Sequence, residues 1–403
     1  MAQAAGVFKQ LTYKQEVSYG LKPAAATAQS LRRVTSDLSL TKQTYQSNEI
    51  RTDQQMQDFR HGVRSVDGTI AGELSPGTYA DFIDAALRRV RTTGATAGTM
   101  SVTIAGAGPT YTVTRAAGSY LTDGFKRGDV VRLSVGVLNA ANINKNLLIV
   151  TLTATIATVR VLNGVAMVAE GPIASTTMTV IGKKTFAPTS GHIDRSFSIE
   201  HWFADVAQSE VYTGCQPTKI DISLPPTGLA TISIPMMGKD VETSTSQYFT
   251  SPTAATVTGL TAAVNGEILV GGVSVASLTG LTLSIESSRS GDPVVGSNTI
   301  PTRFPGRILV SGQATAYFED AVLRDAFLNE AEIEIMVVLT SDETATSNFL
   351  AFVLPRCKLG GNSKSDGEGG IVQTIPFQSL LPTTGGTGIA NELTTVSVQD
   401  SAA

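Results

Sequence analysis

The chain has 403 residues, of which 42% are hydrophobic and only 16% charged, and its formal net charge is −4. The small net charge and the lack of a strongly basic segment exclude a protein that holds nucleic acid by neutralising phosphates. Two cysteines are too few for a disulfide framework, and no apolar run approaches the length of a membrane span. Abundant Thr and Val favour strands, and Gly and Ser favour turns, so we expect an all-β fold of two or three domains.

The charged fraction is low compared with the roughly 25% that is usual for soluble chains. We therefore expect part of the surface to be covered by other subunits. The N-terminal stretch to Ser30 shows no strong pattern, so an arm is one interpretation. It has no basic stretch followed by an apolar core, which argues against a signal peptide.

An internal repeat follows further along the chain. Residues 62–68 read GVRSVDG and residues 306–312 read GRILVSG, both of the form G-x-x-x-V-x-G at an offset of 244. Residues 47–52 likewise resemble residues 297–302. The repeat predicts one domain used twice.

Each copy of the repeat runs into a predicted helix. The first follows Ser75-Pro76, a favourable start, and the second begins near Asp320. Apolar residues with helical spacing support both helices. In the first they are Tyr79, Phe82, Ile83, Ala86 and Val90, and in the second Val322, Leu323, Ala326 and Phe327.

The two copies differ in length after these helices. Residues 196–200 best match residues 348–352, and the drop in offset from 244 to 152 implies 92 extra residues in the first copy. Short strand-like runs separated by turns fill residues 93–184, which predicts a small inserted β-barrel or sandwich.

The resulting division has four parts. The first domain is discontinuous and comprises residues 1–92 and 185–212 around the insert at 93–184. The second domain spans residues 213–382, with a long loop from Ser244 to Thr261. Residues 383–403 are small and polar, as in an arm or a flexible tail.

No group of reactive residues points to catalysis. The histidines His61, His192 and His201 form no close ligand pair, and Cys215 and Cys357 lie in unrelated contexts. We therefore expect no enzyme activity, no cofactor and no metal. The Gly-rich stretch 360–370 is interpreted as a mobile loop. The basic residues Arg88, Arg89 and Arg91 are interpreted as a solvated helix end that pairs with a neighbouring subunit.

Acidic residues alternate with apolar ones in two strand-like segments. Glu332 and Glu334 would share one sheet face, and Asp221 has a similar setting. If subunits close into a ring, carboxylates on the inner face would repel phosphates and let DNA slide. Candidate channel-lining residues are Glu332, Glu334, Asp221 and Glu200.

Several segments, taken in order, resemble the tail tube proteins of siphophages, the long-tailed bacteriophages. They are residues 48–55, 68–79, 118–125 with 128–131, 212–215 with 223–228, and 291–298. The resemblance implies β-sandwich tube domains, each flanked by a helix, that close into rings and stack into a tail for DNA ejection. With two tube domains per chain, three copies would make a pseudo-six-fold ring.

The same resemblance implies a virion tail protein that is assembled in the host cytoplasm. Its partners would be further copies of itself and the tape measure, tail terminator and baseplate or distal tail proteins. DNA would be met only in transit, and no membrane anchor is expected. Two alternatives stay open: another phage tail, baseplate or tail-terminator protein, and a bacterial β-sandwich adhesin.

Overall fold

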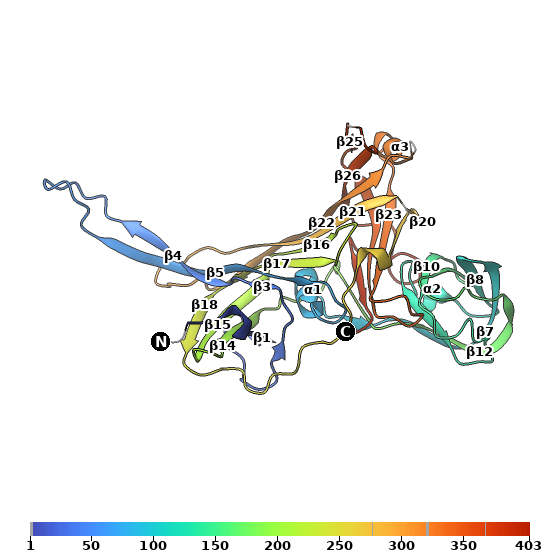
Figure 1. Cartoon of the computed structure of the whole chain (residues 1–403), viewed down its shortest axis with the longest axis horizontal. Coiled ribbons are helices and arrows are strands. Elements are labelled where there is room, and N and C mark those ends of the chain that lie inside the picture. Colours follow the sequence, from blue (N-terminus) through green and yellow to red (C-terminus); the bar gives the residue numbers. More distant parts are fainter. Residues whose placement is uncertain (1–2, 276, 320–321, 367) are drawn as a thin grey trace.

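The computed structural model describes residues 3–275, 277–319, 322–366 and 368–403. The fold is all-β, which confirms the expectation from composition (Figure 1). The α-helices of the described residues are short: α1 (Ala80–Leu87), α2 (Tyr120–Asp123) and α3 (Val322–Leu328). Two single 3₁₀ turns, η1 (Gly6–Phe8) and η2 (Ala263–Asn265), complete the helical elements.

A continuous antiparallel layer runs through both halves of the chain. Its strands, in spatial order, are β4 (Ser39–Gln46), β5 (Phe59–Glu73), β17 (Thr231–Gly238), β16 (Lys219–Leu224), β21 (Leu278–Ser290), β22 (Phe304–Tyr317) and β26 (Val372–Ser379). The two-residue strands β3 (Thr35–Ser36) and β25 (Ser363–Lys364) extend it next to β5 and β26. We call this layer the continuous sheet.

Two further strand groups lie behind the continuous sheet. The first pairs in the order β2 (Gln29–Ser30), β1 (Lys9–Gln15), β14 (Phe197–Phe203), β15 (Gln208–Pro217) and β18 (Asp240–Ser244). The second pairs in the order β20 (Val273–Ser274), β19 (Gly266–Val270), β23 (Ile333–Thr340), β24 (Phe349–Leu359) and β27 (Ser397–Asp400). The ends of β15 and β24 cross over to β17 and β26, which joins each group to the continuous sheet.

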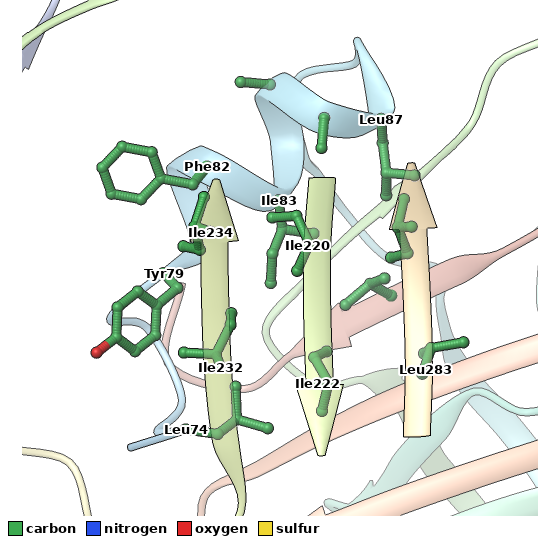
Figure 2. Packing of buried hydrophobic residues seen from close by; sticks show 14 of the residues in the cluster. Leu74, Tyr79, Phe82, Ile83, Leu87, Ile220, Ile222, Ile232, Ile234 and Leu283 are labelled. Carbon is green, nitrogen blue, oxygen red and sulfur yellow. The ribbon is translucent and has the colours of Figure 1, made fainter. Parts of the chain in front are cut away.

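Helix α1 fills the space between the layers of the first half (Figure 2). Its residues Phe82, Ile83 and Leu87 are buried against isoleucines and leucines of β17, β16 and β21. Alternation in those strands explains how they present an apolar face to α1, since Ile220 and Ile222 point inward while Asp221 between them points outward.

The boundaries of α1 differ from the sequence prediction at both ends. The helix begins at Ala80, after a turn in which the Ser75 and Thr78 hydroxyls bond each other. It ends before Arg88, whose left-handed backbone (φ 55°) interrupts the helical path. Val90 therefore lies outside the helix and is partly exposed.

A closed six-stranded barrel lies between α1 and β14 in the sequence. Its strands are β7 (Thr96–Ala107), β8 (Thr110–Arg115), β9 (Val130–Ser134), β10 (Leu147–Leu152), β11 (Ile156–Val161) and β12 (Glu170–Val180). It has its own core, in which Tyr120, Phe125 and Leu133 are fully buried. The chain enters and leaves through β6 (Thr92–Thr93) and β13 (Lys183–Phe186), which pair with each other.

The barrel packs on the outer side of the β19–β23–β24 group. Val130, Leu148 and Val150 of the barrel form one apolar cluster with Met336 and Val338 of β23. Since successive residues of a strand point to opposite faces, the even-numbered residues of β23 face the barrel and the odd-numbered ones face the core.

The C-terminal segment is part of this packing and is not a loose tail. Strand β27 fills the gap between β13 and β24. The buried Gln399 side chain bonds both the N–H and the C=O of Val130 in the barrel. The N-terminal segment is likewise built in, because β1 contributes the buried Leu11 and Tyr13 to the core.

Candidate functional site

The solvent side of the continuous sheet is an extended polar surface that crosses both halves. One row across the strands comprises Ala71, Ser233, Asp221, Ser284, Ser311 and Gln378, each directly opposite the next. The adjacent row contains Glu73, Thr231, Ser223, Thr282 and Gln313. Hydroxyl and amide groups dominate these rows, while the opposite face of the same strands is apolar and buried.

Asp221 lies near the middle of this polar face. Its carboxylate pairs with Lys219 on the same strand at 2.9 Å, and Lys219 lies directly opposite Glu286 of β21. Two carboxylates and one ammonium group thus belong to neighbouring positions of this face. The local charge of the face is therefore negative, which disfavours contact with phosphate groups.

Glu332 lies elsewhere, immediately before β23 in the rear strand group. It is half-exposed and forms an ion pair with Arg356, which lowers the pKa of the carboxyl. It does not share a face with Asp221.

Glu200 and Glu334 are buried within the subunit, which corrects their assignment as channel-lining residues. Glu200 of β14 has no exposed surface and accepts hydrogen bonds from the Ser209 hydroxyl and from the backbone N–H groups of Tyr248 and Phe249. Alternation in the sequence gave no indication of this, since the two backbone donors come from a loop about 50 residues away.

Glu334 lies under the inserted barrel, where it pairs with Arg127. Burial raises the pKa of this carboxyl to about 7, although the guanidinium opposes the shift. The even-numbered face of β23 is covered by the barrel, so the carboxylate is not presented to solvent.

The basic residues after α1 are engaged within the chain rather than solvated. Arg91 pairs with Asp81 and Asp84, both at 2.9 Å. The Arg89 guanidinium lies over the ring of Phe186 at 3.5 Å, and Arg88 is buried.

Part of the Gly-rich stretch 360–370, which was interpreted as a mobile loop, forms the short strand β25.

The histidine and cysteine side chains show no arrangement for chemistry. His201 is buried, and its Nε2 atom hydrogen-bonds the Ser36 hydroxyl at 2.8 Å. Burial lowers the pKa of His201 to about 3, which keeps the ring neutral. Burial also raises the thiol pKa of both Cys215 and Cys357, so these free cysteines are poor nucleophiles.

Within the described residues, no cluster of three or more His, Cys, Asp or Glu side chains could hold a metal ion. No helix in the described ranges is long and apolar enough to cross a membrane. The candidate functional surface is therefore the polar face of the continuous sheet. The fold and this surface define a structural β-protein built for contacts over a wide area.

The comparison with family models identifies which structural protein it is. The family described as phage tail tube protein matches residues 9–379, nearly the whole chain. The chain therefore belongs to the phage tail tube protein family and is a structural component of the virion tail that self-assembles and associates with other tail proteins. Membership in this family favours a non-enzymatic role. The search of curated proteins gave no match.

Proposed function

We propose that the chain carries two tandem tube domains, with the barrel as an insert in the first, and that three chains close into a pseudo-six-fold ring. The rings stack into the tube of a siphophage tail, and DNA leaves the virion through the enclosed channel. The single observation that carries this proposal is the continuous sheet, which crosses both halves with one polar face.

The repeated strand order supports the two-domain division. The order β2–β1–β14–β15–β18 has a counterpart in β20–β19–β23–β24–β27. We therefore place β16, β17 and β18 in the first half of the chain, beyond the boundary at residue 212 expected from the sequence. Cys215 and Cys357 occupy matching places, opposite Phe197 and Ile333 respectively. In this alignment β14 corresponds to β23, one strand earlier than the match between residues 196–200 and 348–352.

The chemistry of the polar face supports its proposed role as the wall of the DNA channel. A wall of hydroxyl and amide groups offers few cations to hold a phosphate backbone, and Asp221 with Glu286 adds repulsion. The continuous sheet is open at β4, so closure across subunits would pair backbone groups that an isolated subunit leaves exposed.

A protruding hairpin supports stacking or lateral contact. Strands β4 and β5 continue beyond the body of the subunit (Figure 1), and the hairpin carries the exposed apolar residues Tyr45, Ile50 and Met56. Apolar side chains on a projecting hairpin are typical of a surface that another copy covers.

Electron microscopy and native mass spectrometry of the purified chain test the proposal. We expect rings or tubes with three-fold symmetry at the level of chains and a particle mass that is a multiple of three 42.1 kDa chains. Rings with six separate chains, or a protein that stays monomeric at high concentration, would contradict it.

A second experiment tests the channel wall. Tubes of the Asp221→Lys variant should retain short double-stranded DNA at low salt, whereas wild-type tubes should not. Glu332→Lys serves as the matched control. Glu332 immediately precedes β23, which belongs to a strand group behind the continuous sheet and not to its polar face. DNA retention by Glu332→Lys tubes alone would place the channel on the other layer.

A further inference from the structure

The seam between the two halves has a defined construction. Strand β16 of the first half pairs with β21 of the second, and Asp221 lies opposite Ser284. Helix α1 packs beneath this seam, with Ile83 and Leu87 against the inward side chains of both strands (Figure 2). The seam therefore has a strand pair on its polar side and a buried helix behind it.

The second half contains counterparts of β16 and α1, but it lacks, among the described residues, a strand that pairs with the counterpart of β16 as β21 pairs with β16. Strand β25 lies beside β26 as β16 lies beside β17, and α3 follows β22 as α1 follows β5. Yet β25 has two residues where β16 has six, and its register within the described residues is with β26 alone. Helix α3 lies at the periphery of the molecule (Figure 1). Its Leu328 side chain is 67% exposed.

We propose that β4 of a second copy of the chain pairs antiparallel with residues 361–366 and reproduces the internal seam, with α3 packed beneath it. This inference rests on the proposed ring. Strand β4 is the fitting occupant because it precedes β5 and pairs with it, just as β21 precedes β22 and pairs with it. Among the described strands its only partner is β5, so its outer edge is free.

The internal repeat fixes the equivalent residues on the β25 side. Asp221 lies opposite Ser233, and Ser363 lies opposite Thr374. Ser233 and Thr374 are equivalent, because each lies three residues before the residue that pairs with the end of β15 or β24, Met236 and Phe377 respectively. Ser363 therefore takes the place of Asp221.

The same reasoning places the β4 side. Leu40 lies opposite Val66, and Ile285 lies opposite Val310, where Val66 and Val310 are the valines of the repeated G-x-x-x-V-x-G motif. Ser39 is thus equivalent to Ser284. Transfer of the Asp221–Ser284 register predicts that Ser363 faces Ser39 of the second copy.

This register is chemically consistent. Ser39 and Ser363 would both lie on the polar face, continuing its row of hydroxyl groups. Leu40 would point inward, above α3, as Ile285 points toward α1 in the internal seam. The contact is head-to-tail, because β4 and β25 lie at opposite ends of the sheet, so repetition of it generates a ring.

Disulfide trapping tests the register. The Ser39→Cys/Ser363→Cys double variant should form covalent dimers and trimers on mild oxidation of assembled particles, seen on a non-reducing gel. Both native cysteines are buried and should stay unreactive. Ser39→Cys/Ser311→Cys is the matched control, because Ser311 lies on the same face but within the sheet. It should give no covalent oligomer.

The outcomes separate the two proposals. Rings in the microscope without covalent oligomers from the Ser39/Ser363 variant would overturn this register and leave the proposed function standing. Failure of the wild-type chain to form rings would overturn the proposed function itself.

A surface variant tests the part played by α3. Leu328→Asp should fold like the wild type, because the side chain is exposed in the subunit, but should raise the concentration for half-maximal assembly by roughly tenfold or more. Val137→Asp is the control, since Val137 is 92% exposed on the inserted barrel. Equal effects of the two variants on assembly would show that α3 does not lie in the interface.

Discussion

Replacement of Glu200 by Ala should destabilise the subunit strongly, because this carboxylate ties a loop of the second half to the first. It accepts hydrogen bonds from the Ser209 hydroxyl (2.6 Å), from the Tyr248 N–H (2.6 Å) and from the Phe249 N–H (2.9 Å). A longer contact of 3.3 Å joins it to the Thr12 hydroxyl. Phe249 is fully buried next to this point, so its backbone N–H has no access to water in compensation.

The expected magnitude follows from the groups left behind. Each buried donor that loses its partner costs about 1–3 kcal/mol, and two backbone N–H groups cannot turn toward another acceptor. We therefore expect a loss of about 3–5 kcal/mol in the free energy that holds the loop closed. This loss corresponds to a decrease of roughly two to three and a half orders of magnitude in amide protection, at about 1.4 kcal/mol per factor of ten.

Hydrogen–deuterium exchange of residues 245–253 measures this loss directly, and chemical denaturation measures the effect on the whole subunit. Glu332→Ala is the matched control, because it removes a half-exposed carboxylate with one ion pair and should leave the stability close to that of the wild type. Equal protection of the loop in Glu200→Ala and wild-type protein would refute the reasoning and reopen a surface role for Glu200.

Three further predictions concern stability. Gly312→Ala should destabilise by about 1–3 kcal/mol in denaturant titrations, because its Cβ would lie 2.3 Å from a backbone oxygen of β21, whereas Gly6→Ala, with open space around it, should be neutral; equal midpoints would contradict the packing. The folded-state pKa of His201 lies below its unfolded value, because the buried ring stays neutral while the ring of the unfolded chain takes up a proton. The free energy of unfolding should therefore fall as the pH drops below about 6.5, by about 2 kcal/mol at pH 5. His201→Asn should therefore lose less stability than wild type between pH 7 and pH 5, and parallel pH profiles would argue against a buried neutral ring. Lys184→Met should cost about 3–5 kcal/mol by leaving the Asp129 carboxylate buried without its cation, and the added change Asp129→Leu should recover much of that loss; additive losses in the double variant would contradict the pairing.

The sequence alone determined the all-β class and much of the local pattern. Alternation of apolar and polar residues in segments such as 219–224 depends only on the two-residue period of a strand, so Ile220 and Ile222 were bound to face inward. The repeated G-x-x-x-V-x-G motif could also be recognised from the sequence. Its second glycine in the later copy, Gly312, packs so closely against β21 that a residue with a Cβ would not fit. The resemblance to tail tube proteins depended on residue identity and order in the same way.

Tertiary structure decided which acidic residues are available. Glu334 and Asp221 have the same alternating surroundings in the sequence, yet one lies under the inserted barrel and the other on the polar face. A local pattern specifies that two faces of a strand differ, but it does not specify what covers either face. The covering element comes from elsewhere in the chain: the barrel for Glu334 and the loop at Tyr248 for Glu200. Long-range packing, which is not visible in a strand's own sequence, therefore determined the site.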